Sequence, residues 1–174
     1  MAQDIIKELK EEIDDVFVLN EVLHKINGNT EHIDIQVNNL VILGSALFAF
    51  SATGYISGGP TIHYYLLVLA LFSSLSAVTG LLALNPPGFL DKRGQKDSKL
   101  YTHGIAGYKF QEDYYEAIKT MLADKEKTVE QYALEIYNLS KFSYLPKRKL
   151  FNLSKNLLIV GFLLSFILFA FQIK

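Results

Sequence analysis

The chain has 174 residues, half of them apolar, with no cysteine, no tryptophan and a formal net charge of −1. This length provides material for one domain, and the absence of cysteine excludes a disulfide framework and the usual thiolate zinc sites. The charges are unevenly spread, because residues 1–34 hold nine acidic and three basic side chains, whereas the long apolar runs hold none.

Residues 1–29 are expected to form an amphipathic helix that resembles one strand of a coiled coil. Its seam recurs at alternating steps of three and four residues, as the a and d positions of a heptad do. The seam residues are Ile6, Leu9, Ile13, Val16, Asn20 and Leu23. The seam either joins copies of the chain, with Asn20 setting the oligomer number, or packs against the chain's own soluble helices. Asn27-Gly28-Asn29 favours a C-cap and is expected to end this helix.

Residues 38–84 are predicted to form a hairpin of two membrane-spanning helices, the first of them with Thr30 as its N-cap. Two apolar runs, each close to the roughly 20 residues that span a bilayer, flank a Gly-Gly-Pro turn. Neither run carries a charged side chain. A buried hairpin of a soluble bundle is the alternative, but such helices usually keep a polar stripe.

Small and polar residues in this hairpin are suited to helix contact or to lining a pore. One chain of three spans cannot enclose a pore, so several copies would have to surround it. The predicted pore-lining residues are Asn38, Asn39, Ser45, Thr53, Ser73, Ser76 and Thr79.

A third span is predicted over residues 150–173, where the apolar run is again long enough to cross a bilayer. Basic residues precede this span and follow the second one, whereas the turn between the first two spans has none. The positive-inside rule therefore places the N-terminus and residues 85–149 in the cytoplasm. The sequence predicts an all-α membrane protein with three transmembrane helices, an N-terminal amphipathic helix and a cytoplasmic two-helix insertion.

Within the insertion, residues 85–149, the segment LYTHGIAGYKF at 100–110 is expected to form an ordered loop or a short strand. A helix follows over residues 111–123, and Asp124 is the predicted N-cap of the next helix. Pro146 is expected to kink or break that second helix.

The same insertion carries the candidate ligand-binding residues. Aromatic stacking beside a basic side chain is the chemistry that holds a nucleobase and its phosphate. The candidates are Tyr101, His103, Tyr108, Lys109, Lys141, Lys147 and Arg148. In the alternative interpretation the tyrosines are core residues and the basic cluster only anchors the topology.

No pattern in the sequence indicates catalysis, a metal site or a cofactor. The four histidines lack metal-ligand spacing, no nucleophile motif surrounds a serine, and no glycine-rich phosphate loop opens a helix. The chain is therefore expected not to be an enzyme.

Several segments occur in a characteristic order. They are DIQVNN at 34–39, NPP at 85–87, LYTHGIAGYKFQEDYYEAI at 100–118, EQYALEIYNLSKFSYLPKRKLFNLS at 130–154, and a last apolar run containing Gly161. In these segments the chain resembles the Pycsar effector family of bacterial antiphage membrane proteins, and more loosely the SLATT group of defence pores. One departure is Gln36, because relatives often carry a lysine two residues after the aspartate at position 34.

The resemblance implies a multi-pass effector of abortive infection in the bacterial inner (plasma) membrane. A partner cyclase or nucleotidyltransferase would change a nucleotide signal upon infection, and oligomers of the effector would then permeabilise the membrane. The signal would be a nucleotide second messenger, a cyclic pyrimidine mononucleotide in Pycsar systems, or a short oligonucleotide. The alternative is a non-conducting membrane-anchored scaffold that recruits a partner through its acidic N-terminal helix.

Overall fold

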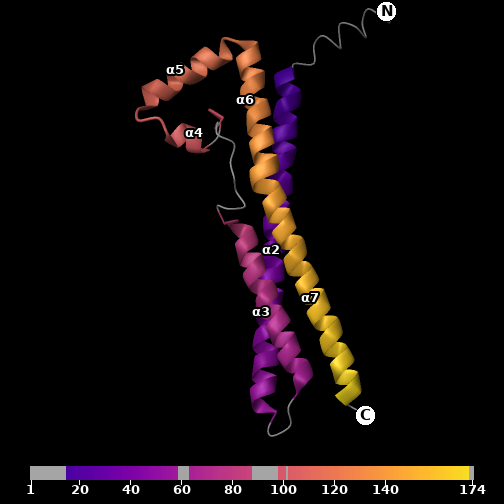
Figure 1. The fold of residues 1–174 in the computed structure, drawn as a ribbon. Coiled ribbons are helices and arrows are strands. Elements are labelled where there is room, and N and C mark those ends of the chain that lie inside the picture. The colour runs from indigo at the N-terminus through magenta and orange to yellow at the C-terminus, as the bar shows by residue number, and fades with distance from the viewer. Residues whose placement is uncertain (1–14, 59–62, 88–97, 101, 173–174) are drawn as a thin grey trace, which may run out of the picture. The chain divides into compact units, whose positions relative to one another are not determined.

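A computed structural model describes residues 15–58, 63–87, 98–100 and 102–172 (Figure 1). The helices of this part are α2 (Asp15–Ser57), α3 (Tyr64–Leu84), α4 (Thr102–Ala106), α5 (Gln111–Leu122), α6 (Lys125–Asn138), the π-helix η1 (Leu139–Tyr144) and α7 (Leu145–Gln172). The described residues divide into two compact units. We call Thr30–Asp91 with Leu145–Lys174 the bundle unit, and Met1–Asn29 with Lys92–Tyr144 the insertion unit.

Three helical stretches are long and apolar enough to cross a membrane: Val16–Ser57, Tyr64–Leu84 and Lys125–Gln172. The prediction of three apolar helices of spanning length is therefore confirmed. Large apolar side chains such as Ile42, Val78 and Phe166 are exposed on their outer faces. Extended apolar surface of this kind is unfavourable in water and matches the hydrocarbon of a bilayer.

Serines connect α3 to α7 inside the bundle unit. Ser76 Oγ donates a hydrogen bond to Ser154 O at 2.9 Å, and Ser154 Oγ donates one to Ser76 O at 2.7 Å. Towards the other end of the same contact, Ser165 Oγ donates to Tyr65 O at 2.7 Å. Interhelical bonds of this kind satisfy polar groups that lipid cannot satisfy, and each contributes about 0.6–2 kcal/mol.

Glycines allow the three helices of the bundle unit to approach closely. A Cβ added at Gly44 of α2 would lie 3.1 Å from Ser73 O of α3. A Cβ at Gly80 of α3 would lie 2.7 Å from Val41 of α2 and 3.4 Å from the Ser154 hydroxyl of α7. Gly80 therefore lies at the level where the three helices meet, and a side chain there would displace at least one of them.

The helix α2 continues through Asn27-Gly28-Asn29, so the prediction that the first helix ends there was wrong. Thr30, the predicted N-cap, consequently lies in the interior of α2. A glycine inside a helix costs only about 1 kcal/mol, and it keeps the N–H donor that proline lacks. The helix-forming residues on both sides therefore outweigh the local stop signal.

Residues 102–106 form the short helix α4, which corrects the expectation of a loop or a short strand in this segment. A strand needs a neighbouring strand to satisfy its backbone groups, and no strand is present in the ranges that the structure describes. A helical turn satisfies them locally instead, and Tyr108 N donates to Ile105 O at 3.2 Å just beyond α4.

The predicted interruption near Pro146 takes the form of a change in helix type. The α-helical pattern gives way to the π-helix η1 and resumes at Leu145, so that α6, η1 and α7 follow one another without a loop (Figure 1). Proline lacks an N–H donor, and its ring crowds the preceding turn of a regular α-helix. A π-helical turn directly before Pro146 is where such a mismatch can be absorbed.

Asp124 caps α6, as the sequence predicted. Its side chain accepts hydrogen bonds from Glu126 N at 3.1 Å and Lys127 N at 3.3 Å. The hydrogen bond from the Lys127 side chain, followed by that from the Lys127 backbone, lowers the pKa of the Asp124 carboxyl. Thr128 Oγ1 donates to Met121 O at 2.9 Å and thereby joins the start of α6 to the end of α5.

Gly161→Ala should destabilise the bundle unit, because the new Cβ would meet the Phe72 side chain of α3. Overpacking a tight contact costs about 1–3 kcal/mol, which thermal unfolding in detergent micelles would measure. Gly28→Ala is the matched control, because nothing lies within 4 Å of a Cβ there and alanine is favoured in a helix. Equal effects of the two substitutions would contradict the close contact of α3 with α7.

Candidate functional site

Gln131 of α6 holds the short segment that precedes α4 in the insertion unit. Ser98 Oγ donates to Gln131 O at 3.2 Å, and Lys99 N donates to Gln131 Oε1 at 2.9 Å. Leu100 N donates to the Ser98 hydroxyl oxygen at 3.0 Å, and Ser98 is fully buried. These bonds fix the backbone of residues 98–100 relative to α6.

A cavity of about 310 Å³ lies beside this segment and is lined by Ser98, Lys99, Gly104, Gly107 and Tyr108. The helix α4 can approach residues 98 and 99 closely because Gly104 has no side chain. A Cβ added there would meet Ser98 O and would lie 3.6 Å from Lys99 Cα. Small-molecule sites typically measure roughly 300–1,000 Å³. The cavity is therefore of a size for one small ligand, and its two glycines leave backbone open to close approach.

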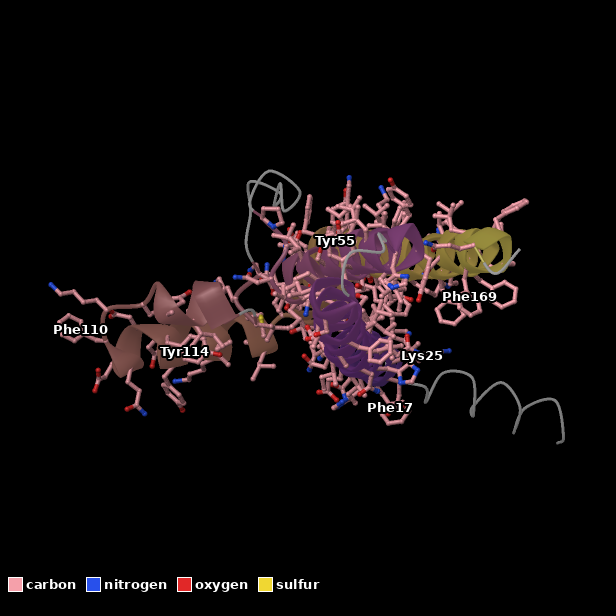
Figure 2. All side chains as sticks on the ribbon, turned by 90° about the horizontal axis from the view of Figure 1, so that it is seen from below. Phe17, Lys25, Tyr55, Phe110, Tyr114 and Phe169 are labelled. Carbon is pink, nitrogen blue, oxygen red and sulfur yellow. The ribbon has the colours of Figure 1, made fainter. Side chains whose placement is uncertain are left out.

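One residue that lines this cavity, Tyr108, belongs to a pair of aromatic rings. The Tyr108 ring meets the Tyr114 ring edge-on, with 5.4 Å between the ring centroids. The Lys109 ammonium lies 5.6 Å from the centroid of the Phe110 ring, and Figure 2 shows Phe110 and Tyr114 projecting from this part of the chain. Among the residues that line the cavity, Tyr108 is the aromatic one and Lys99 the basic one. These residue types can stack on a base and pair with a phosphate.

Among the predicted ligand residues, Tyr108 lines the cavity. Tyr101 lies outside the described residues, and His103 lies in α4, where only the course of its backbone is described. Sequence reasoning did not include Lys99. Its position directly before the LYTHG segment, two residues before Tyr101, is a signal that could have identified it.

The predicted ligand residue Lys141 lies on η1 among aromatic side chains. Its ammonium donates to the Tyr137 hydroxyl and lies 4.9 Å from the centroid of the same ring and 5.6 Å from that of Phe142. A lysine over exposed aromatic rings gains about 0.5–1 kcal/mol from the cation–π attraction. The ring contacts hold the Lys141 ammonium at the surface of the insertion unit.

Lys147 at the start of α7 forms an ion pair with Asp34 of α2, inside the bundle unit. Its Nζ lies 2.7 Å from Oδ1 and 2.8 Å from Oδ2, so both carboxylate oxygens accept hydrogen bonds. The Lys147 side chain is only 13% exposed and that of Asp34 35%. The pair is only partly exposed to water, so removal of either partner would leave a charge that is incompletely solvated.

At position 36, where the family resemblance leads us to expect a lysine, the Gln36 side chain hydrogen-bonds the His32 ring at 3.0 Å on the exposed side of α2. Asp34 nevertheless has a lysine partner, because Lys147 reaches it from α7. The predicted ligand residue Arg148, next in the chain, has an exposed side chain.

The predicted pore-lining residues fall into two groups. Ser73 and Ser76 are fully buried within the chain, and the Thr79 hydroxyl donates to Leu75 O of its own helix at 2.7 Å. The other members of the set all lie on α2, and their side chains are exposed. They are Asn38, Asn39, Ser45 and Thr53.

The predicted oligomer seam is described only in its second half, because Ile6, Leu9 and Ile13 lie outside the described residues. Val16, Asn20 and Leu23 are half-buried in the insertion unit. Phe17, beside them, is 62% exposed and points away from α2 (Figure 2). This burial within one chain favours packing against its own helices, and the use of the seam between copies stays a prediction.

Among the described residues, no group of three or more His, Asp or Glu side chains could hold a metal ion. Apolar helices of spanning length together with a polar helical unit define an α-helical membrane protein. Residues 18–173 match the family model of the Pycsar effector protein domain, and the chain belongs to this family. It is therefore a membrane effector of cyclic nucleotide-signalled antiphage defence. No curated protein and no solved structure matches the chain.

Asp34→Asn and Lys147→Met should each lower the free energy of unfolding by about 1.5–3 kcal/mol, because each leaves the partner charge unpaired. The double substitution should recover most of that loss, since it removes both charges together. Thermal unfolding of the four proteins in detergent measures the coupling energy. Lys149→Met, at an exposed neighbouring position, should have little effect. Strictly additive losses would show that the two side chains do not interact.

Proposed function

We propose that copies of this chain assemble into a pore in the bacterial inner membrane, and that a nucleotide signal opens the pore during phage infection. The N-terminus and the insertion unit are cytoplasmic in this proposal, which the basic residues flanking the second and third spans support. Serines and glycines fill the contact between α3 and α7, so a water path requires more than one copy. The resulting ion flux would depolarise the infected cell and abort the infection.

The observation that carries the gating role is the uninterrupted helical path from the cavity to the third span. Gln131 of α6 holds residues 98–100 at the cavity, and α6 continues through η1 into α7 without a loop. A ligand that moves residues 98–100 therefore acts on α6. A helix can transmit such a shift along its axis, and π-helical turns are frequent at functional sites.

We propose the cavity of Ser98, Lys99, Gly104, Gly107 and Tyr108 as the binding site for the signal. Its volume of about 310 Å³ suits one mononucleotide better than an oligonucleotide. Lys99 supplies one positive charge for one phosphate, and Tyr108 supplies a ring for the base. The ligand would come from a partner cyclase or nucleotidyltransferase. Lys141 and Arg148 stay predicted contacts outside the cavity.

The purified protein in liposomes should conduct ions only when the correct cyclic mononucleotide is supplied. A fluorescent potassium or proton flux assay would measure this, with cyclic pyrimidine and purine mononucleotides and short oligonucleotides compared at equal concentration. A non-conducting scaffold is the rival function, which the exposed apolar residues Phe17, Val18 and Val22 in the first part of α2 favour. If no ligand produces ion flux and a protein partner binds this part of α2, the scaffold function is supported and the pore is rejected.

Lys99→Ala and Tyr108→Ala should each weaken binding of the activating nucleotide roughly tenfold to a hundredfold, because each removes a charged or stacking contact. Isothermal titration or a nucleotide-dependent thermal shift in detergent would measure the affinity. Lys109→Ala is the matched lysine control, because Lys109 is exposed and lies over Phe110 instead of lining the cavity. Lys141→Ala and Arg148→Ala test the contacts outside it. Unchanged affinity in Lys99→Ala and Tyr108→Ala would move the site elsewhere.

A further inference from the structure

One face of α2 carries exposed polar groups that the described residues leave unsatisfied. Asn38, Asn39, Ser45 and Thr53 are exposed, and none of them makes a hydrogen bond to another described residue. We call these four residues the polar face of α2. Ser51, in contrast, is buried and donates to Leu47 O at 2.6 Å within its own helix.

The serine and threonine hydroxyls of the other two spans differ from those of the polar face, because they are satisfied within the described residues. Each serine and threonine of α3 and α7 donates a hydrogen bond, either within its own helix or across the α3–α7 contact. The donors are Ser73, Ser74, Ser76, Thr79, Ser154 and Ser165. Large apolar side chains such as Leu71, Val78 and Phe162 cover the outer faces of these helices. Lipid therefore suits the exposed surface of α3 better than that of α2, and α7 differs from α3 because Asn152 and Asn156 are exposed on it.

The polar face is separate from the side of α2 that packs inside the bundle unit. Val37, Gly44 and Ser51 are buried at steps of seven residues. Asn38 and Ser45 each follow a buried residue by one position, which is about 100° around a helix. From Asn38 to Thr53 the face extends 15 residues, or about 22 Å, which is most of the thickness of a hydrocarbon core.

Hydrocarbon cannot satisfy these side chains, because an amide or hydroxyl transferred from water without a hydrogen-bond partner loses free energy. Water or polar groups of another helix can satisfy them. Ser45, Ala49 and Thr53 recur every four residues, a spacing that lets two such faces approach closely. A second copy of the chain brings an identical polar face, and each copy then removes the other's unsatisfied groups from lipid.

We infer that the polar face of α2 faces the other copies of this chain and lines the water path between them, while the outer face of α3 faces lipid. This rests on the proposed oligomeric pore and names the helix that builds it. Ile42 is 68% exposed on the same side of α2. In this arrangement it also lines the water path, at a level between the two asparagines and Ser45. Ser73 and Ser76 stay inside each copy, where they hold α3.

Cysteine substitution tests this inference directly, because the natural chain contains no cysteine. Ser45→Cys is compared with Ser74→Cys on α3, which makes the same chemical change, and with Leu71→Cys on the outer face of α3. In native membranes treated with an oxidant, Ser45→Cys should form disulfide-linked dimers at least tenfold more than Leu71→Cys. In nucleotide-activated liposomes, a charged thiosulfonate reagent should reduce flux through Ser45→Cys and Thr53→Cys and leave Ser74→Cys unchanged.

The two readouts separate this inference from the proposed pore. Crosslinking through Ser45→Cys with no flux in any variant would keep the α2 interface and reject the pore. Flux that the reagent blocks through Ser74→Cys or Leu71→Cys, but not through Ser45→Cys and Thr53→Cys, would keep the pore and overturn the assignment of α2. Preferential crosslinking through Leu71→Cys would also overturn it.

Discussion

The bundle unit depends on the absence of a side chain at Gly80. At this level α2 and α7 both approach α3, and a single Cβ would meet Val41 from one helix and Ser154 from the other. The close approach brings Ser76 and Ser154 within range of each other's backbone carbonyls. Because lipid tails are as apolar as leucine, such packing and hydrogen bonding, and not hydrophobic burial, hold the helices together. Ser76, Gly80 and Ser154 consequently lie inside, and large side chains such as Val78 and Phe162 lie outside.

The sequence predicts the spans well because their length and their lack of charge reflect the bilayer itself. The sequence predicts poorly which side of each span packs against the other helices of the chain. A helix that is apolar all round has no amphipathic pattern, so Ser73, Ser76, Ser45 and Thr53 looked equivalent in the sequence. In the structure, Ser73 and Ser76 are buried inside the chain, whereas Ser45 and Thr53 are exposed. Only three-dimensional packing distinguishes the two pairs.

In the polar part of the chain, short sequence signals such as helix caps and stops predict local structure, but they do not predict contacts between distant residues. The cap at Asp124 was predictable, because a side chain and two backbone donors within three residues make it. Asn27-Gly28-Asn29 was misleading, because a glycine inside a helix costs only about 1 kcal/mol, so α2 can continue through this stop signal. The ion pair of Asp34 with Lys147 joins positions 113 residues apart and leaves no spacing signal. The cavity likewise depends on Gln131. No sequence motif predicts the contacts of Gln131 with residues 98–100.

In the proposed mechanism, a gating movement would meet two structural constraints at the start of α7. Pro146 follows the π-helix η1, and the next residue, Lys147, is held by both oxygens of Asp34 on α2. A shift passed along α6 can therefore end in two ways. The π-helical turn can absorb it by changing register, in which case α7 stays fixed to α2 and the ligand has no effect on the spans. If η1 keeps its register, the shift reaches α7 and works against the ion pair. The strength of that pair then sets how much of the nucleotide's binding energy is needed to move the third span.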